Sequence, residues 1–151
     1  MMLLQRRIRF PNAVLCAGPA GVYFASGVEV EASVEAGLAR VRALDNDGQF
    51  LPFTVLVDLH HVVGLRMAAL RSTETVLPVG GATCAAGCDD QGTLILRVQS
   101  TLQVERDSLG VLVLAPGPDM PWTIGLHAAA VDEFLALIGE CAAACPGIAV
   151  A

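Results

Sequence analysis

Four cysteines form two pairs with the same spacing, and this pattern suggests chemistry most directly. Cys84 and Cys88 are four positions apart, as are Cys141 and Cys145. Two thiolates from each of two segments are a common way to build a tetrahedral zinc site. The second pair lies on a predicted helix, where both side chains share one face and suit a buried surface equally well. The pattern therefore leaves three alternatives: a four-thiolate zinc site, a disulfide involving the first pair, or inert thiols.

Histidines supply the second candidate site. The chain has three histidines, His60, His61 and His127, and Glu74 is the carboxylate that we group with them as candidate ligands for a metal or a small molecule. Neighbouring residues on a strand point to opposite faces, so His60 and His61 cannot easily serve one site. One of them, with Glu74, could face the interior of a barrel. The alternative is that the histidines lie at the surface or cap a helix.

Three arginines near the N-terminus form the third candidate site. Arg6, Arg7 and Arg9 could hold a phosphate group, because a guanidinium group can donate two parallel hydrogen bonds to phosphate oxygens. The stretch Gln5–Pro11 resembles the arginine-rich opening of PilZ domains, and this resemblance implies binding of a cyclic dinucleotide. The acidic, serine and glycine residues that PilZ domains carry on a following strand have no counterpart here, and the arginine spacing differs. The alternative is a first strand with solvated charges.

The composition excludes several functions. The chain contains no lysine and has a net charge of −6, so a Walker-type phosphate loop and a Schiff-base lysine are ruled out. An acidic chain is also a poor partner for nucleic acid. The sequence contains neither a Gly-x-Ser-x-Gly nucleophile elbow nor a dinucleotide-binding fingerprint. A cysteine nucleophile with a distant histidine stays open, because such residues meet only in space. We therefore favour a function other than catalysis.

Alternation of apolar and charged residues predicts antiparallel strands. In Gly21–Val34, for example, Val28 and Val30 fall on one face and Glu29 and Glu31 on the other. Residues 33–44 fit either a helix or a strand, and the Asp-Asn-Asp-Gly turn signal at 45–48 favours a hairpin. Residues 80–92 are expected to form a loop. The other predicted strands are Arg6–Cys16, Gln49–Leu59, His60–Leu70, Thr75–Val79, Thr93–Val104, Leu109–Ala115 and Trp122–Leu126.

An amphipathic helix is predicted at Ala128–Ala144, with His127 near its N-cap and Pro146-Gly147 beyond its end. We expect one globular domain over residues 1–151, mainly β within the α+β class. The expected architecture of this domain is a small antiparallel barrel or sandwich of about seven strands, closed by this one C-terminal helix. The order of elements is compatible with pleckstrin-homology-like (PH-like) barrels.

The apolar composition indicates a binding role. Hydrophobic residues make up 54% of the chain and charged residues only 16%, with a mean hydropathy of +0.61. Either apolar surface is buried between subunits, or a coding bias inflates the small apolar residues. We predict a non-enzymatic binding or assembly module whose partner is a second copy of the chain, in a homo-oligomer, or another protein. The contact surfaces would be strand edges and the C-terminal helix, above all its end. The expected interface residues are Trp122, Phe134, Ile138, Cys141 and Cys145.

Other functions and partners follow from the same residues. The alternative function is a small-ligand or metal-dependent β-barrel that uses the histidines or the cysteine zinc site, and a weaker alternative is nucleotide binding through the three arginines. No cofactor other than this zinc is predicted. No run of about 18 apolar residues is present, so no membrane partner is expected, and a cytoplasmic location is the default.

Overall fold

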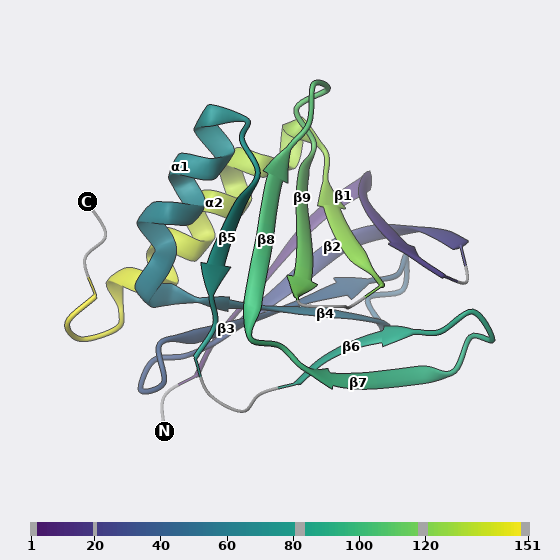
Figure 1. The fold of residues 1–151 in the computed structure, drawn as a ribbon, viewed down its shortest axis with the longest axis horizontal. Coiled ribbons are helices and arrows are strands. Elements are labelled where there is room, and N and C mark those ends of the chain that lie inside the picture. The colour runs from purple at the N-terminus through teal and green to yellow at the C-terminus, as the bar shows by residue number, and fades with distance from the viewer. Residues whose placement is uncertain (1–2, 20, 81–83, 118–120, 149–151) are drawn as a thin grey trace.

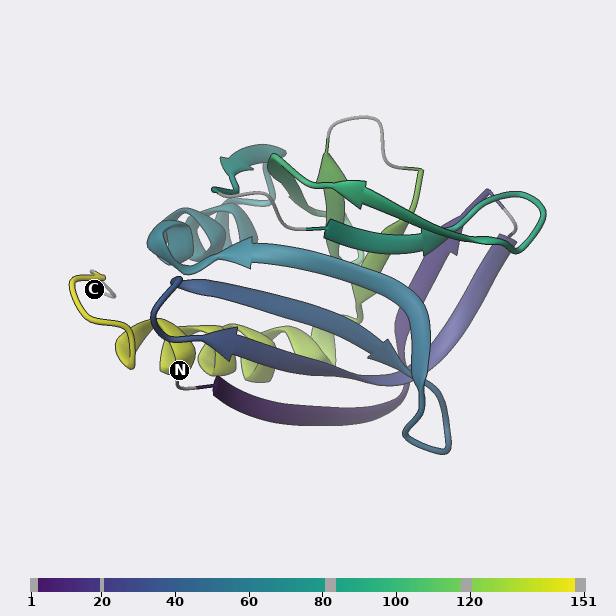
Figure 2. The same cartoon turned by 90° about the horizontal axis from the view of Figure 1, so that it is seen from below.

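One antiparallel sheet of eight strands forms most of the molecule in the computed structural model, which describes residues 3–19, 21–80, 84–117 and 121–148 (Figure 1). Its strands are β1 (Leu3–Gly18), β2 (Gly21–Ser33), β3 (Leu38–Leu44), β4 (Phe50–Asp58), β5 (Thr75–Pro78), β8 (Thr101–Arg106), β9 (Leu112–Gly117) and β10 (Thr123–Leu126). Their order in the sheet is β4-β3-β2-β1-β10-β9-β8-β5. The chain is thus mainly β, and the sheet curls into a half-barrel (Figure 2).

Two meanders build this sheet and meet in its middle. Strands β1 to β4 follow one another as hairpins, and so do β8 to β10. The two groups join where β1 pairs with β10, from Val14 opposite Leu126 to Ala17 opposite Thr123. A separate hairpin of β6 (Cys84–Cys88) and β7 (Leu94–Val98) lies alongside β4.

The same turn chemistry closes three of the hairpins. In the β3–β4 turn, the Asp45 carboxylate accepts the backbone N–H groups of Asp47 and Gln49, each at 2.9 Å, and Gly48 has a φ of 79°. Glycine adopts this left-handed conformation without steric cost. The turns that start at Asp89 and Asp107 repeat the arrangement, with Gly92 and Gly110 in the place of Gly48.

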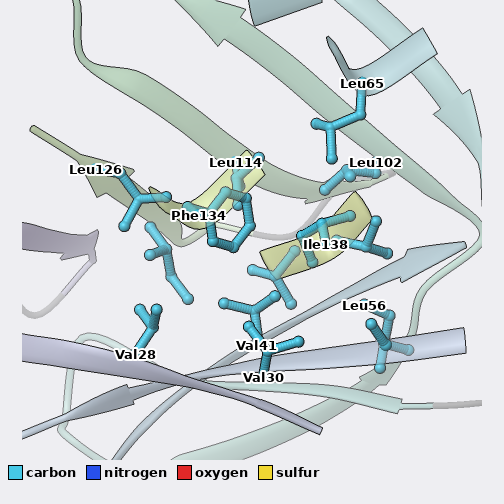
Figure 3. Close-up of a cluster of buried hydrophobic side chains, with 14 of the residues drawn as sticks. Val28, Val30, Val41, Leu56, Leu65, Leu102, Leu114, Leu126, Phe134 and Ile138 are labelled. Atoms are coloured by element: carbon cyan, nitrogen blue, oxygen red, sulfur yellow. The ribbon is translucent and has the colours of Figure 1, made fainter. Parts of the chain in front are cut away.

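Two helices cover the concave side of the sheet. Helix α2 (Ala128–Ala143) packs on β1, β2 and β10, and helix α1 (Val62–Arg71) packs on β8 and β5. Phe134 and Ile138 of α2 are fully buried, and Figure 3 shows them among aliphatic side chains from both meanders. Truncating a buried side chain of this size costs about 3–5 kcal/mol. The centre of α2 therefore holds the two halves of the sheet together.

The structure confirms the C-terminal helix and the strand in residues 33–44. Helix α2 begins after His127, whose Nδ1 accepts the Ala129 N–H at 3.2 Å. The expected barrel of about seven strands differs from what is found, because the described residues form ten strands and the large sheet stays open at two edges. A second helix, absent from the prediction, also accompanies α2.

Three predicted segments differ from the structure. Thr93–Val104, predicted as one strand, divides into β7 and β8, which belong to different sheets. His60–Leu70 was predicted as a strand, but residues 59–61 form a short 3₁₀ helix, η1 (Leu59–His61), and α1 follows. Short apolar runs fit a helix or a strand equally well. Here the helix is favoured because Arg106 donates a hydrogen bond of 3.2 Å to the Ala69 carbonyl, near the end of α1. The loop predicted at residues 80–92 contains strand β6.

The outer edge of β4 is covered by side chains from distant parts of the chain. The fully buried Gln99 amide donates from Nε2 to the Leu56 carbonyl and accepts the Leu56 N–H at Oε1, both at 2.9 Å. The Trp122 indole donates to the Thr54 carbonyl at 3.3 Å, and the Ala86 N–H donates to the Thr54 hydroxyl at 2.6 Å. These contacts replace a neighbouring strand and hold the β6–β7 hairpin against β4.

Replacing Gln99 should destabilise the fold. In Gln99→Ala the buried N–H and carbonyl of Leu56 lose their partners, so the free energy of unfolding should fall by about 2–4 kcal/mol. Urea denaturation followed by circular dichroism measures this. The matched control is Gln103→Ala, since Gln103 is exposed on β8 and should change stability by less than about 0.5 kcal/mol. Equal stability of the two variants would contradict the role of Gln99.

Candidate functional site

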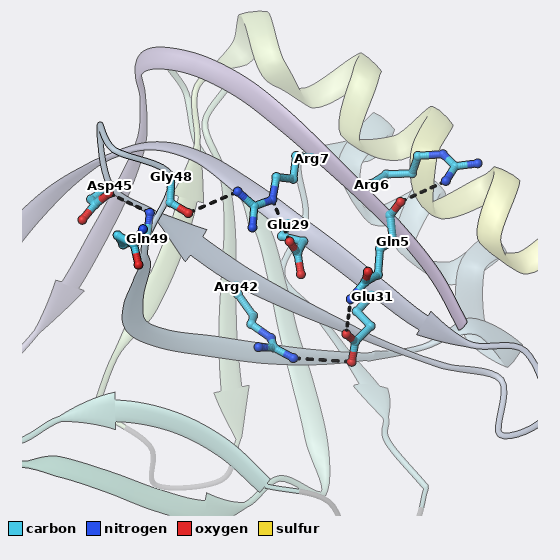
Figure 4. A network of polar contacts seen from close by, with 9 residues as sticks. All are labelled: Gln5, Arg6, Arg7, Glu29, Glu31, Arg42, Asp45, Gly48 and Gln49. Carbon is cyan, nitrogen blue, oxygen red and sulfur yellow. Dashed lines mark hydrogen bonds and ion pairs between the residues drawn. The ribbon is translucent and has the colours of Figure 1, made fainter. Parts of the chain in front are cut away.

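Charged side chains form cross-strand rows on the convex face of β1, β2 and β3 (Figure 4). Glu29 lies between Arg7 and Arg42 in the register of the three strands. The Glu29 carboxylate is 5% exposed and accepts the Arg7 Nε–H at 2.8 Å. Glu31 accepts the Gln5 amide at 2.7 Å and Arg42 at 3.4 Å. Both carboxylates are therefore paired with side chains of the flanking strands.

Phe50, at the start of β4, lies beneath two of these arginines. The guanidinium carbons of Arg42 and Arg7 are 4.6 Å and 5.7 Å from the centre of its ring. Arg7 also donates to the Gly48 carbonyl at 3.1 Å. A cation over an aromatic face is attracted by the ring quadrupole, so the β3–β4 turn is fixed to the charged face of β1 and β3.

A groove lies beside this charged face, between β3–β4 and the β6–β7 hairpin, with a volume of about 290 Å³. Arg40 and Arg42 of β3 supply its cationic side, and Phe50 an aromatic surface. Arg40 has no polar partner in the described part of the chain, and the Nε of Arg42 is buried without an acceptor. The remaining lining residues are Leu51, Pro52, Thr54, Cys84, Ala86 and Leu96.

The structure divides the three N-terminal arginines between two faces. Arg7 and Arg9 lie on the convex face, and both guanidinium groups approach Gly48. Arg6 points the other way, towards α2, where it lies 3.6 Å from the Glu140 carboxylate and donates to the Gln5 carbonyl. The separation follows from the alternation of side chains along a strand. Sequence reasoning missed the contacts of Arg7 with Glu29, Gly48 and Phe50, because these residues come from elements that meet Arg7 only in the fold.

Asp58 caps the N-terminus of η1 and also contacts the His60 ring. The Asp58 carboxylate lies 2.7 Å from the His60 Nδ1 and also accepts the backbone N–H groups of His60 and Gly80. Burial raises the pKa of Asp58, but these hydrogen bonds and the His60 ring outweigh it, so the pKa lies below its usual value. His61 is half-buried and Glu74 is exposed after α1. Within the described residues nothing brings His60, His61 and Glu74 together as ligands.

The cysteine pairs lie on separate elements. Cys84 is exposed on β6 and Cys88 is buried, whereas Cys141 and Cys145 are buried on α2 or just beyond its end. Figure 1 places β6 and the C-terminal end of α2 at opposite ends of the view. Burial raises the pKa of the Cys141 and Cys145 thiols, which disfavours the thiolate that zinc needs. No group of three or more metal-ligating side chains occurs in the described ranges.

The residues expected at an interface are buried in the core. Trp122, Phe134, Ile138, Cys141 and Cys145 are between 0% and 5% exposed. Gly87 explains the depth of Trp122, because a Cβ at residue 87 would lie 2.2 Å from the indole ring. None of these five side chains is therefore available to a partner on the surface of this fold.

A row of exposed apolar side chains lies on β7. Leu94, Leu96 and Val98 occupy one face of this strand and are 57–59% exposed. The sequence pattern groups them correctly on one face, but the usual expectation that such a face turns inwards does not hold here. Across the hairpin, the inner face carries small residues, since Ala85 is fully buried and Gly87 packs on Trp122.

The hydrogen bonds of the hairpin leave the outer edge of β7 open. The Asp89 N–H donates to the Thr93 carbonyl at 3.0 Å. Because hydrogen-bonded pairs alternate along an antiparallel ladder, the backbone bonds between β6 and β7 lie at Gly87 with Ile95 and at Ala85 with Arg97. The alternate pairs are Cys88 with Leu94, Ala86 with Leu96, and Cys84 with Val98. Their backbone groups point outwards, as the Ala86 N–H does towards Thr54. No other described strand pairs with the outer edge of β7.

Lowering the pH should remove the stability that Asp58 contributes. Because its pKa is lower in the folded protein than in the unfolded chain, its contribution is complete above about pH 4 and is lost as the pH falls through the folded value. Asp58→Asn should therefore be less stable than wild type by about 1–2 kcal/mol at pH 7, with a smaller difference at pH 3. Urea denaturation at both pH values tests this, with the exposed Asp90→Asn as control. A difference independent of pH would contradict it.

None of the helices in the described ranges is long and apolar enough to span a bilayer. Comparison with protein-family models, curated proteins and solved structures found no match.

Proposed function

We propose that this protein is a non-enzymatic assembly module that forms a homodimer through the outer edge of β7. The observation that carries the proposal is the coincidence of unpaired backbone groups and exposed aliphatic side chains at Leu94, Leu96 and Val98. Open strand edges pair readily with other strands, and proteins usually protect them with proline, charge or a covering segment.

The two edges of the large sheet contrast with β7. The Gln99 amide and the Trp122 indole cover the edge of β4, which also contains Pro52. The edge strand β5 is only four residues long and ends in Pro78. Strand β7 contains no proline, and its single charged residue, Arg97, points to the other face from Leu96. An edge without protection, in a fold that protects its other edges, supports pairing with a partner strand.

A second copy of the chain fits this edge in sequence and register. In an antiparallel pair with its two-fold axis at Leu96, Leu94 of each copy faces Val98 of the other, and the two Leu96 residues face each other. Each facing pair then exchanges two backbone hydrogen bonds, because the N–H and carbonyl groups of these residues already point outwards. Arg97 faces Ile95 rather than the other Arg97, so no like charges are directly opposed.

The test is the molar mass in solution at increasing protein concentration. A single short strand buries less area than a permanent interface, so we expect a monomer–dimer equilibrium in the micromolar range. Leu96→Arg should shift the equilibrium to monomer. Leu109→Arg is the matched control, because Leu109 is 81% exposed in the β8–β9 turn. Sedimentation velocity and size-exclusion chromatography with light scattering provide the measurement.

A backbone variant separates strand pairing from simple apolar contact. In Val98→Pro the outward N–H of residue 98 is lost, while the bonds between β6 and β7 are kept. We expect this variant to be monomeric with its circular dichroism spectrum preserved. A wild-type protein that stays monomeric to millimolar concentration, or a dimer that survives both variants, would exclude the β7 interface.

A further inference from the structure

We propose that the groove between β3–β4 and the β6–β7 hairpin binds a small organic monoanion with an apolar body, of the class of medium-chain or aromatic carboxylates. The groove shares Leu96 with the proposed β7 interface, but the proposal does not depend on the dimer, because Arg40 and Arg42 form the charged side of the groove. The groove has a volume of about 290 Å³. This volume suits a small ligand, since pockets for drug-sized molecules begin at about that size.

Charge selects an anion for this groove. The chain as a whole is acidic, with a net charge of −6, yet the residues that line the groove include two arginines and no carboxylate. Arg40 and Arg42 lie two residues apart on β3 and both line the groove. An acidic protein therefore presents a local excess of positive charge at one place, which favours an anionic partner.

Two guanidinium groups have unused hydrogen-bonding capacity there. Arg40 has no polar partner within the described residues, and the buried Nε of Arg42 lacks an acceptor. A buried donor without a partner costs free energy that an acceptor would recover. The Glu31 carboxylate lies 3.4 Å from the Arg42 Nη2 and neutralises part of the positive charge of Arg42. The charge that remains suits a carboxylate better than a dianionic phosphate.

The rest of the groove suits the apolar part of such a ligand. Leu51, Pro52, Ala86 and Leu96 line it, and the Phe50 ring is 46% exposed beside them. Stacking with Arg42 leaves part of the ring accessible, and packing against it buries apolar area on both sides. The carboxylate is expected at Arg40 and Arg42, with the chain or ring directed towards β6 and β7.

Cys84 makes occupancy of the groove measurable. It lines the groove and is exposed, whereas the four other cysteines, all in the described part of the chain, are buried. Alkylation by iodoacetamide should therefore modify Cys84 first, and a ligand in the groove should slow this reaction. The rate of modification, followed by mass spectrometry of the Cys84 peptide, reports binding at this place and not elsewhere.

The experiment uses octanoate as the probe, with octanamide and inorganic phosphate for comparison. We expect octanoate to slow Cys84 alkylation and to displace the fluorescent anion 8-anilinonaphthalene-1-sulfonate, while octanamide and phosphate have at least tenfold weaker effects. Arg40→Gln should weaken octanoate binding about tenfold, in keeping with the loss of a charge-assisted hydrogen bond. The matched control is Arg97→Gln, which removes an exposed arginine that does not line the groove.

Several results would overturn this proposal. Equal protection by octanamide would show an apolar groove with no preference for charge, and equal protection by phosphate would show an anion site with no apolar part. The absence of any protection by octanoate would exclude the site. Repeating the titration with the monomeric Val98→Pro variant separates the two proposals, because binding should persist there whether or not the wild-type protein dimerises.

Discussion

The pairing of the Gln99 side chain with Leu56 is the contact on which the two proposed binding surfaces depend. An antiparallel sheet that does not close leaves a row of unpaired backbone groups on its last strand. In this fold an amide side chain completes β4 as a strand residue would, and the Trp122 indole continues the coverage. The chain before Gln99 is thereby held as a hairpin against β4. The groove exists only because that hairpin is docked there, since Cys84, Ala86 and Leu96 form one of its sides.

Local patterns determined what could be predicted from the sequence. The C-terminal helix, strand β2 and the turn at residues 45–48 each carry their signal within a few residues, and the structure contains all of them. Helix α1 could not be separated from a strand, because its apolar run is short and its end is held by the distant Arg106. Strand β6 has only small residues and so lacks alternation. Its Gly87 is required by Trp122, a contact that only the fold reveals.

The candidate site was predictable only in part. The sequence identified arginines as the basic residues of interest, but alternation along β1 separates Arg6 from Arg7, and strand pairing brings Arg42 to Glu29 instead. The packing of these side chains requires arginine and could not be made by lysine. A planar guanidinium can lie flat over Phe50 and still donate within its plane, which an ammonium group cannot do. The arginines thus combine stacking with ion pairing on one crowded face.

The junction of β1 and β10 has a consequence for the order of folding. Three hairpins carry their own aspartate–glycine turns and can form from neighbouring residues alone. The junction instead joins residues 14–17 to residues 123–126, and closing so long a loop is slow because its entropic cost precedes any gain. We expect the two meanders to gain their hairpins early and to remain separate until this junction forms. During that interval β7 and the inner faces of both meanders are exposed to solvent together, so association between chains competes with completion of the core.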